Sequence, residues 1–280
     1  MVLWVLAAAA AAAALFAGYM VAASFRYRLD VQTVAHERLP GGFDGTRVLF
    51  ISDVHRRVIP DAVIARCADT GGAELVLVGG DLREKGVPLA RSRTNIRKLR
   101  RIAPIYLVYG NNDHRMDIRP LEVMLEEERV RVLSNESVVL EKGGSRIRLA
   151  GVDDPRTERD RLPLALEEPE GGGPSFTLLL AHDPIIATRI SPDMRIDLAL
   201  CGDTHGGQVV LPLLGPLVRR FSVMNFRCGW FRPFKQPGGE TFRMFVSCGF
   251  GTSGMPIRFG TPAELHLFTL TTGKGSAVDR

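Results

Sequence analysis

The first 25 residues are uniformly apolar, whereas the rest of the chain alternates short apolar runs with polar segments. This first stretch contains no charged side chain and includes an unbroken run of alanines from Ala7 to Ala14. About 20 apolar residues are enough for a helix to cross a bilayer, so residues 1–25 predict a transmembrane anchor. A cleaved secretory signal is the alternative interpretation, with Ala22-Ala23-Ser24 as a small-residue cleavage site.

Basic residues flank this apolar segment on one side only. No Lys or Arg precedes it, although a secretory signal needs a basic start, and Arg26 and Arg28 follow it at once. By the positive-inside rule, this asymmetry predicts a single-pass anchor in the inner (cytoplasmic) membrane with the domain on the cytoplasmic face. Residues 26–45 are expected to form an extended linker, residues 46–272 one domain, and residues 273–280 a tail.

Beyond residue 45 the apolar pattern alternates between strands and amphipathic helices. Strands are predicted at 46–52, 75–78, 105–109, 176–181, 198–201, 245–247 and 264–270. Helices are predicted at 60–69, 88–101 and 118–128. The strand–helix–strand order at the start of the domain implies right-handed crossovers and a parallel sheet, and therefore an α/β fold. Short runs at 130–133, 137–140 and 146–150, with a Lys142-Gly143-Gly144 turn, indicate hairpins.

Five of the predicted strands lead directly into oxygen or imidazole donors. The segments are Asp53-Val54-His55, Gly80-Asp81, Gly110-Asn111-Asn112-Asp113, Ala181-His182-Asp183 and Gly202-Asp203-Thr204-His205. Sheets present ligands at the carboxyl ends of their strands. Each segment alone is commonplace, but together the five predict a metal cluster.

Composition narrows the classes of partner. The net charge is +5, and the densest basic stretch, residues 91–101, has an apolar stripe at Ile96 and Leu99 that indicates a solvated helix face. Aromatic residues do not interleave with its arginines, so no nucleic acid is expected as a partner. The four cysteines show neither zinc-knuckle nor disulfide spacing.

The ordered set Asp-x-His, Gly-Asp, Gly-Asn, His and Gly-x-x-His resembles the calcineurin-like metallophosphoesterase superfamily over residues 46–270. The closing segments Gly249-Phe250-Gly251, Pro256-Ile257-Arg258 and Pro262-Ala263-Glu264 are similar to its membrane-associated bacterial branch. The resemblance implies a four-layer α/β/β/α sandwich. It also implies hydrolysis of a phosphodiester or pyrophosphate bond by a hydroxide that bridges two divalent ions, Mn, Fe or Zn.

The resemblance also assigns residues to this site. The first ion would be held by Asp53, His55 and His205, with Asp81 as a bridge to the second ion, which would add Asn111 and His182. Arg258, in the closing segments, is expected to bind substrate.

Two positions depart from the family pattern. Asn112 stands where the family has a histidine that donates a proton to the leaving group; an amide can only offer a hydrogen bond to a phosphate oxygen. His114, two residues later, is the alternative proton donor. Asp203 replaces a histidine that binds the second metal, and a carboxylate there favours a harder ion such as Mn²⁺ or Mg²⁺.

The sequence therefore predicts a membrane-anchored phosphoesterase whose substrate is phosphorylated or pyrophosphorylated, a lipid being one such substrate. The alternative is a non-catalytic binding or scaffold domain with an altered second metal site. The apolar, aromatic stretch from Leu211 to Phe234 is either a loop that covers the site or a segment that packs on the sheet.

Overall fold

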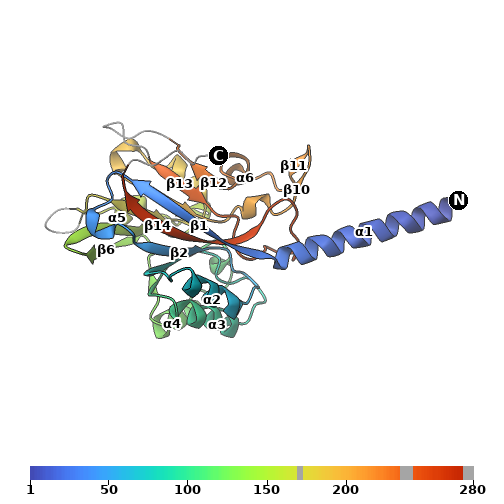
Figure 1. Ribbon diagram of the computed structural model, residues 1–280, viewed down its shortest axis with the longest axis horizontal. Coiled ribbons are helices and arrows are strands. Elements are labelled where there is room, and N and C mark those ends of the chain that lie inside the picture. Colours follow the sequence, from blue (N-terminus) through green and yellow to red (C-terminus); the bar gives the residue numbers. More distant parts are fainter. Residues whose placement is uncertain (169–172, 234–241, 274–280) are drawn as a thin grey trace.

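The computed structural model describes residues 1–168, 173–233 and 242–273, and it shows one long helix projecting from a body built on two six-stranded sheets (Figure 1). The first sheet contains, in spatial order, β1 (Tyr27–His36), β14 (Ala263–Thr272), β2 (Arg47–Ile51), β3 (Leu75–Gly79), β4 (Ile105–Val108) and β5 (Arg131–Val132). The second contains β12 (Gly229–Phe231), β13 (Arg243–Val246), β9 (Leu198–Cys201), β8 (Thr177–Leu180), β7 (Ser145–Gly151) and β6 (Glu136–Lys142). A separate hairpin joins β10 (Val210–Leu211) to β11 (Gly215–Pro216).

The helices are α1 (Val2–Phe25), α2 (Asp61–Asp69), α3 (Leu89–Arg100), α4 (Arg119–Glu127), α5 (Leu162–Ala165) and α6 (Phe221–Asn225). Alternate residues of β2 explain the layers. Leu49 and Ile51 pack under α2, α3 and α4, whereas Val48 and Phe50 face the second sheet. A third core lies on the outer face of the second sheet, under α5 and residues 184–190. The predicted four-layer α/β/β/α sandwich is confirmed, with short helical turns as its fourth layer.

The segment expected to be a linker is instead part of the first sheet. Residues 27–36 form β1, which pairs in parallel with β14 from Tyr27↔Ala263 to His36↔Thr272. Leu29 and Val34 are buried in the cores on opposite faces of the sheet, whereas Val31 is exposed. Most of the predicted tail (274–280) and Phe234 lie outside the described residues.

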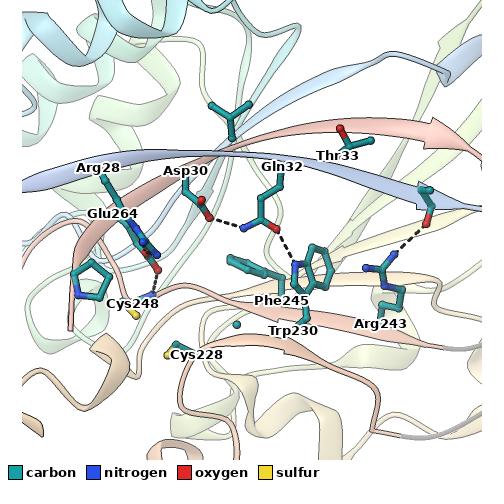
Figure 2. Close-up of a pocket in the computed structure, with 14 residues that line it drawn as sticks. Arg28, Asp30, Gln32, Thr33, Cys228, Trp230, Arg243, Phe245, Cys248 and Glu264 are labelled. Atoms are coloured by element: carbon teal, nitrogen blue, oxygen red, sulfur yellow. Dashed lines mark hydrogen bonds and ion pairs between the residues drawn. The ribbon is translucent and has the colours of Figure 1, made fainter. Parts of the chain in front are cut away.

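Strand β1 also contacts the second sheet across a groove of about 680 Å³ (Figure 2). The indole nitrogen of Trp230 donates to the Gln32 side chain at 2.8 Å, and the guanidinium of Arg243 donates to the Ala35 carbonyl at 3.0 Å. These hydrogen bonds across the groove link β1, at the edge of the first sheet, to β12 and β13 of the second sheet.

The expected hairpins are partly right. Strands β6 and β7 are antiparallel around the Lys142-Gly143-Gly144 turn, as predicted. Strand β5 was wrongly expected to join them: it pairs in parallel with β4 and closes the edge of the first sheet.

One residue separates α1 from β1, and the junction between them is packed. The Ser24 hydroxyl donates to the Pro256 carbonyl at 3.0 Å, and the Arg57 guanidinium lies over the rings of Phe25 and Phe250. Beyond this junction, most of α1 is exposed, and the helix is long and apolar enough to cross a membrane.

Side-chain truncation should lower the free energy of unfolding by different amounts on the two faces of β1. Leu29→Ala should lower the free energy of unfolding by about 2–5 kcal/mol, because it opens a cavity in a packed core. Val31→Ala, the matched control on the exposed face, should change it by no more than about 0.5 kcal/mol. Urea unfolding of the full chain in detergent measures both values. Equal, small effects would show that this segment behaves as a linker.

Candidate metal centre

Five loops bring their donors together where the two sheets meet. Strands β2, β3 and β4 of the first sheet and β8 and β9 of the second all end at this edge. The donors that follow them are Asp53, His55, Asp81, Asn111, His182, Asp203 and His205. The convergence expected from the strand-end motifs is therefore present in the structure.

The donor atoms form two overlapping groups. Those of Asp53, His55 and His205 lie within 4.8 Å of one another, as do those of Asp53, Asp81 and His182. The Asp81 Oδ2 atom lies 3.5 Å from His55 Nε2 and 3.4 Å from His182 Nε2. Asp81 thus reaches a histidine of each group, which fits its expected role as the bridge.

Five of these ligands adopt a backbone conformation that is unusual for residues with a side chain. Asp53, His55, Asp81, Asp203 and His205 all have φ between 51° and 63°. This left-handed conformation costs about 1–2 kcal/mol per residue, and such strain gathers at functional sites. Sharp loops therefore turn each side chain inward immediately after its strand.

Glycines beside the ligands make room for the carboxylates. A Cβ at Gly110 would lie 2.3 Å from Asp81 Oδ1, and one at Gly202 would lie 2.5 Å from Asp53 Oδ2. Any side chain at either position would displace a ligand, so these glycines are needed for close approach.

The hydrogen bonds of the site leave ligand atoms available for a cation. His182 Nδ1 donates to the Gly79 carbonyl at 2.8 Å, which fixes the ring so that Nε2 points into the site. His182 Nε2 and Asp53 Oδ1 are buried and have no hydrogen-bond partner among the described residues. A buried polar atom without a partner is costly unless something binds it. The donor set therefore fits divalent metal ions.

The electrostatics of the site favour positive charge. Burial alone would raise the pKa of Asp81, but the imidazoles of His182 and His55 outweigh it and hold this pKa at about 2. Burial also opposes ionisation of Asp53, and the surrounding histidines again bring its pKa below the usual range. Burial, with His55 and Arg258 nearby, lowers the pKa of His205 to about 4. Burial opposes protonation of His182 and His55, but the neighbouring carboxylates outweigh it and raise the pKa of both imidazoles. The ionised carboxylates and the neutral His205 are therefore ready to ligate a metal ion, whereas His55 and His182 would release a proton when an ion binds.

Asp203 lies at the second group but also holds two arginines. Its Oδ1 is 3.6 Å from His182 Nε2, and its Oδ2 is 2.9 Å from the guanidinium of Arg220. Arg156 donates to Asp203 and to the Asn111 amide oxygen, at 3.4 Å and 3.3 Å. Asp203 is thus placed both to ligate an ion and to position two cations beside it.

Three arginines that the motifs did not indicate line the cavity over the ligands. This cavity, of about 360 Å³, is bordered by Arg115, Arg156 and Arg220 on its polar side. Its apolar side is formed by Val209, Leu217, Val218, Met255 and Ile257. No local pattern in the sequence marks these arginines, because only tertiary packing brings them to the ligands.

The two expected proton donors occupy different surroundings. Asn112 lies beside the bridge: its backbone N–H donates to Asp81 Oδ1 at 2.7 Å, and its amide donates to Asp81 Oδ2. His114 Nε2 lies 2.6 Å from Asp153 Oδ1, and its ring packs on Tyr109. His114 is not among the residues that line the cavity. Asn112 therefore has access to the site, whereas His114 is engaged elsewhere.

The expected role of Arg258 in binding substrate is wrong. Its side chain is fully buried, and its guanidinium donates to the backbone carbonyls of Cys248 (2.7 Å), Gly249 (3.0 Å) and His205 (3.3 Å). Arg258 therefore fixes the loops beneath His205 and has no face open to a ligand.

The apolar stretch after the last motif divides between its two expected roles. Leu217 borders the cavity, whereas Trp230 and Phe231 belong to β12 and pack against the cores of the sandwich. Leu213 and Leu214, between β10 and β11, are exposed to solvent.

Comparison with known proteins agrees with this site. The calcineurin-like phosphoesterase family matches residues 46–207. Protein YpbG of Bacillus subtilis is 35% identical over 229 residues, 80% of this chain and 80% of that protein. Phosphodiesterase YaeI of Escherichia coli is 29% identical over 178 residues, covering 60% and 64%. The bovine transmembrane protein with metallophosphoesterase domain is 30% identical over 251 residues, covering 81% and 53%. The chain belongs to the calcineurin-like phosphoesterase family.

Proposed function

We propose that this chain is a membrane-anchored phosphoesterase that uses two divalent ions to hydrolyse a phosphodiester or pyrophosphate bond. One observation carries the proposal: five strand ends direct buried carboxylates and imidazoles to one point, where Asp53 Oδ1 and His182 Nε2 have no hydrogen-bond partner among the described residues. Family membership and the name of the relative YaeI, a phosphodiesterase, support the same reaction class.

Asp53, His55 and His205 would hold the first ion and His182, Asn111 and Asp203 the second, with Asp81 shared. Mixed imidazole and oxygen donors suit Mn²⁺, Fe or Zn²⁺. When bound, two such ions supply Lewis acidity, which lowers the pKa of a water molecule and neutralises charge on a phosphoryl group. The remaining tasks, namely holding the phosphate and excluding water, fall to the side chains of the cavity.

Arg156 and Arg220 are placed to hold the phosphate. Both guanidiniums are anchored on Asp203, and both border the cavity over the metal ligands. Because guanidinium forks match the geometry of phosphate oxygens, the pair would orient the substrate for in-line attack.

The apolar side of the cavity supports a phosphate carried on a lipid. A phosphate on Arg156 and Arg220 would leave its substituent along Leu217, Val218 and Ile257. Helix α1 is long enough to cross the bilayer, and this anchor would keep the cavity close to such a substrate. The basic residues after α1, Arg26 and Arg28, support placement on the cytoplasmic face.

Removal of the bridge is expected to remove both ions. Asp81→Asn should lower bound metal from about two ions per chain to fewer than one, and activity by more than about 100-fold. Asp153→Asn is the control, because this buried carboxylate contacts His114 and not the ligand set. Metal content after dialysis is measured by mass spectrometry. Retention of two tightly bound ions in Asp81→Asn would contradict the assignment of the bridge.

Loss of a cavity arginine is expected to weaken substrate binding while metal stays bound. Arg220→Gln should raise KM for a soluble phosphodiester about 10- to 100-fold, the value of one charge-assisted hydrogen bond. The exposed neighbour Arg219, changed to Gln, is the matched control and should leave KM unchanged. An unchanged KM in Arg220→Gln would exclude this residue from phosphate binding. Metal-loaded protein that binds phosphoesters without hydrolysing any would instead favour the binding-domain alternative.

The presence of Asn112 in place of a histidine predicts which class of phosphate bond is hydrolysed faster. An alkyl ester expels a basic alkoxide and gains about 10²–10⁴-fold from an acid that protonates it, whereas a pyrophosphate expels a weaker base. The natural chain should therefore prefer pyrophosphates or aryl esters. Asn112→His should raise turnover of alkyl esters selectively, and His114→Gln should have no effect on either class. A loss of activity in His114→Gln would identify His114 as the proton donor.

A further inference from the structure

The hairpin formed by β10 and β11 presents an apolar tip to solvent. Leu213 is completely exposed, and Leu214 and Leu217 are exposed to 66% and 60%. The hairpin forms a two-stranded sheet of its own, outside the two main sheets. Figure 1 shows it at the end of the body from which α1 projects.

This hairpin is attached to α1 through one loop. The Val210 N–H donates to the Phe259 carbonyl at 2.8 Å, and the Phe259 ring lies 5.1 Å from Phe16 and 6.2 Å from Tyr19 between ring centroids. The next residue back, Arg258, donates its backbone N–H to the Met20 carbonyl at 3.0 Å. The hairpin is therefore held in a fixed position beside the C-terminal half of α1.

These contacts place the loop at a definite depth along α1. Phe16 precedes the helix end at Phe25 by nine residues, which at 1.5 Å per residue corresponds to about 13 Å. A loop that contacts Phe16 thus lies beside α1, well back from its C-terminal end. At this depth it is next to the helix that is long and apolar enough to span a bilayer.

We propose that the tip of this hairpin, Leu213 and Leu214 with Leu217 at its base, inserts into the bilayer leaflet that surrounds the C-terminal half of α1. The inference rests on the proposed anchoring of α1 and adds a second membrane contact, one that also brings the apolar side of the cavity to the lipid surface. Arg219 follows the apolar residues and is exposed, so it is placed to meet anionic headgroups.

A lipid surface fits this tip better than a second protein does. The exposed apolar side chains of the hairpin region are Leu213, Leu214, Leu217 and Val218. A stable protein interface needs about 20–30 residues from each partner, which is far more than this tip offers. Continuity with α1 supplies the lipid contact without any additional surface.

Fluorescence quenching by brominated lipid tests the insertion. The full chain is reconstituted into phosphatidylcholine–phosphatidylglycerol vesicles with or without lipid brominated on its acyl chains. In a Trp4→Phe background, Leu213→Trp should be blue-shifted and lose more than half of its added emission in brominated vesicles. Val123→Trp is the matched control, because Val123 is 55% exposed on α4 in the helical layer, away from α1 (Figure 1). Its emission should not change.

The native Trp4 of α1 separates this inference from the proposed anchoring. The difference in quenching between the natural chain and Trp4→Phe, which both keep Trp230, isolates Trp4 and reports the insertion of α1 itself. Quenched Trp4 with unquenched Leu213→Trp would overturn insertion of the hairpin and leave the anchor intact. Unquenched Trp4 would overturn the anchoring and, with it, this inference. A blue shift of Leu213→Trp that depends on protein concentration and not on brominated lipid would assign the tip to a second copy of the chain.

Discussion

The structure depends on holding two ionised carboxylates, Asp53 and Asp81, side by side in a buried site. Like charges taken out of water are costly, and this cost falls only when each oxygen has a partner. Backbone N–H groups of Asp203 and Asn112 donate to Asp53 Oδ2 and Asp81 Oδ1, and three imidazoles surround the other two oxygens, of which Asp53 Oδ1 still lacks a hydrogen bond among the described residues. Such a site cannot be built from one loop. It needs several strand ends aimed at one point, and a sandwich of two sheets supplies them.

The need to aim several strand ends at one point explains why the loops contain strained backbone conformations. The rest of the fold is stable enough to tolerate them. Ligands with left-handed backbones each destabilise the fold slightly, and glycines such as Gly110 and Gly202 are needed where carboxylates pass the chain. The apolar cores above, between and below the sheets offset this cost. Arg258 belongs to the same arrangement, because its buried guanidinium joins the loops under His205 through their carbonyls.

The strands that carry ligands could be predicted from sequence because each is an apolar run buried on both faces and closed by a polar residue. Strand β1 could not, since it lies at a sheet edge and only a few of its side chains, such as Leu29 and Val34, are buried. Its polar positions resemble those of a linker. Arg156 and Arg220 reach the site from segments without a motif, and Arg258 has a motif that carries no information on burial. Local patterns therefore identified the residues that converge at the candidate metal centre, whereas the groups around them depend on tertiary packing.

The single residue between α1 and β1, Arg26, has a mechanical consequence. A domain joined to its anchor by a long flexible linker can tumble and take many orientations to the membrane. This domain has no such linker, because a single residue joins α1 to the first sheet. With α1 in a bilayer, the body would keep one orientation to the surface and would move only as the helix diffuses laterally or spins about its axis. Encounters with a lipid substrate would then occur in two dimensions, with the cavity always presented to the membrane in the same orientation.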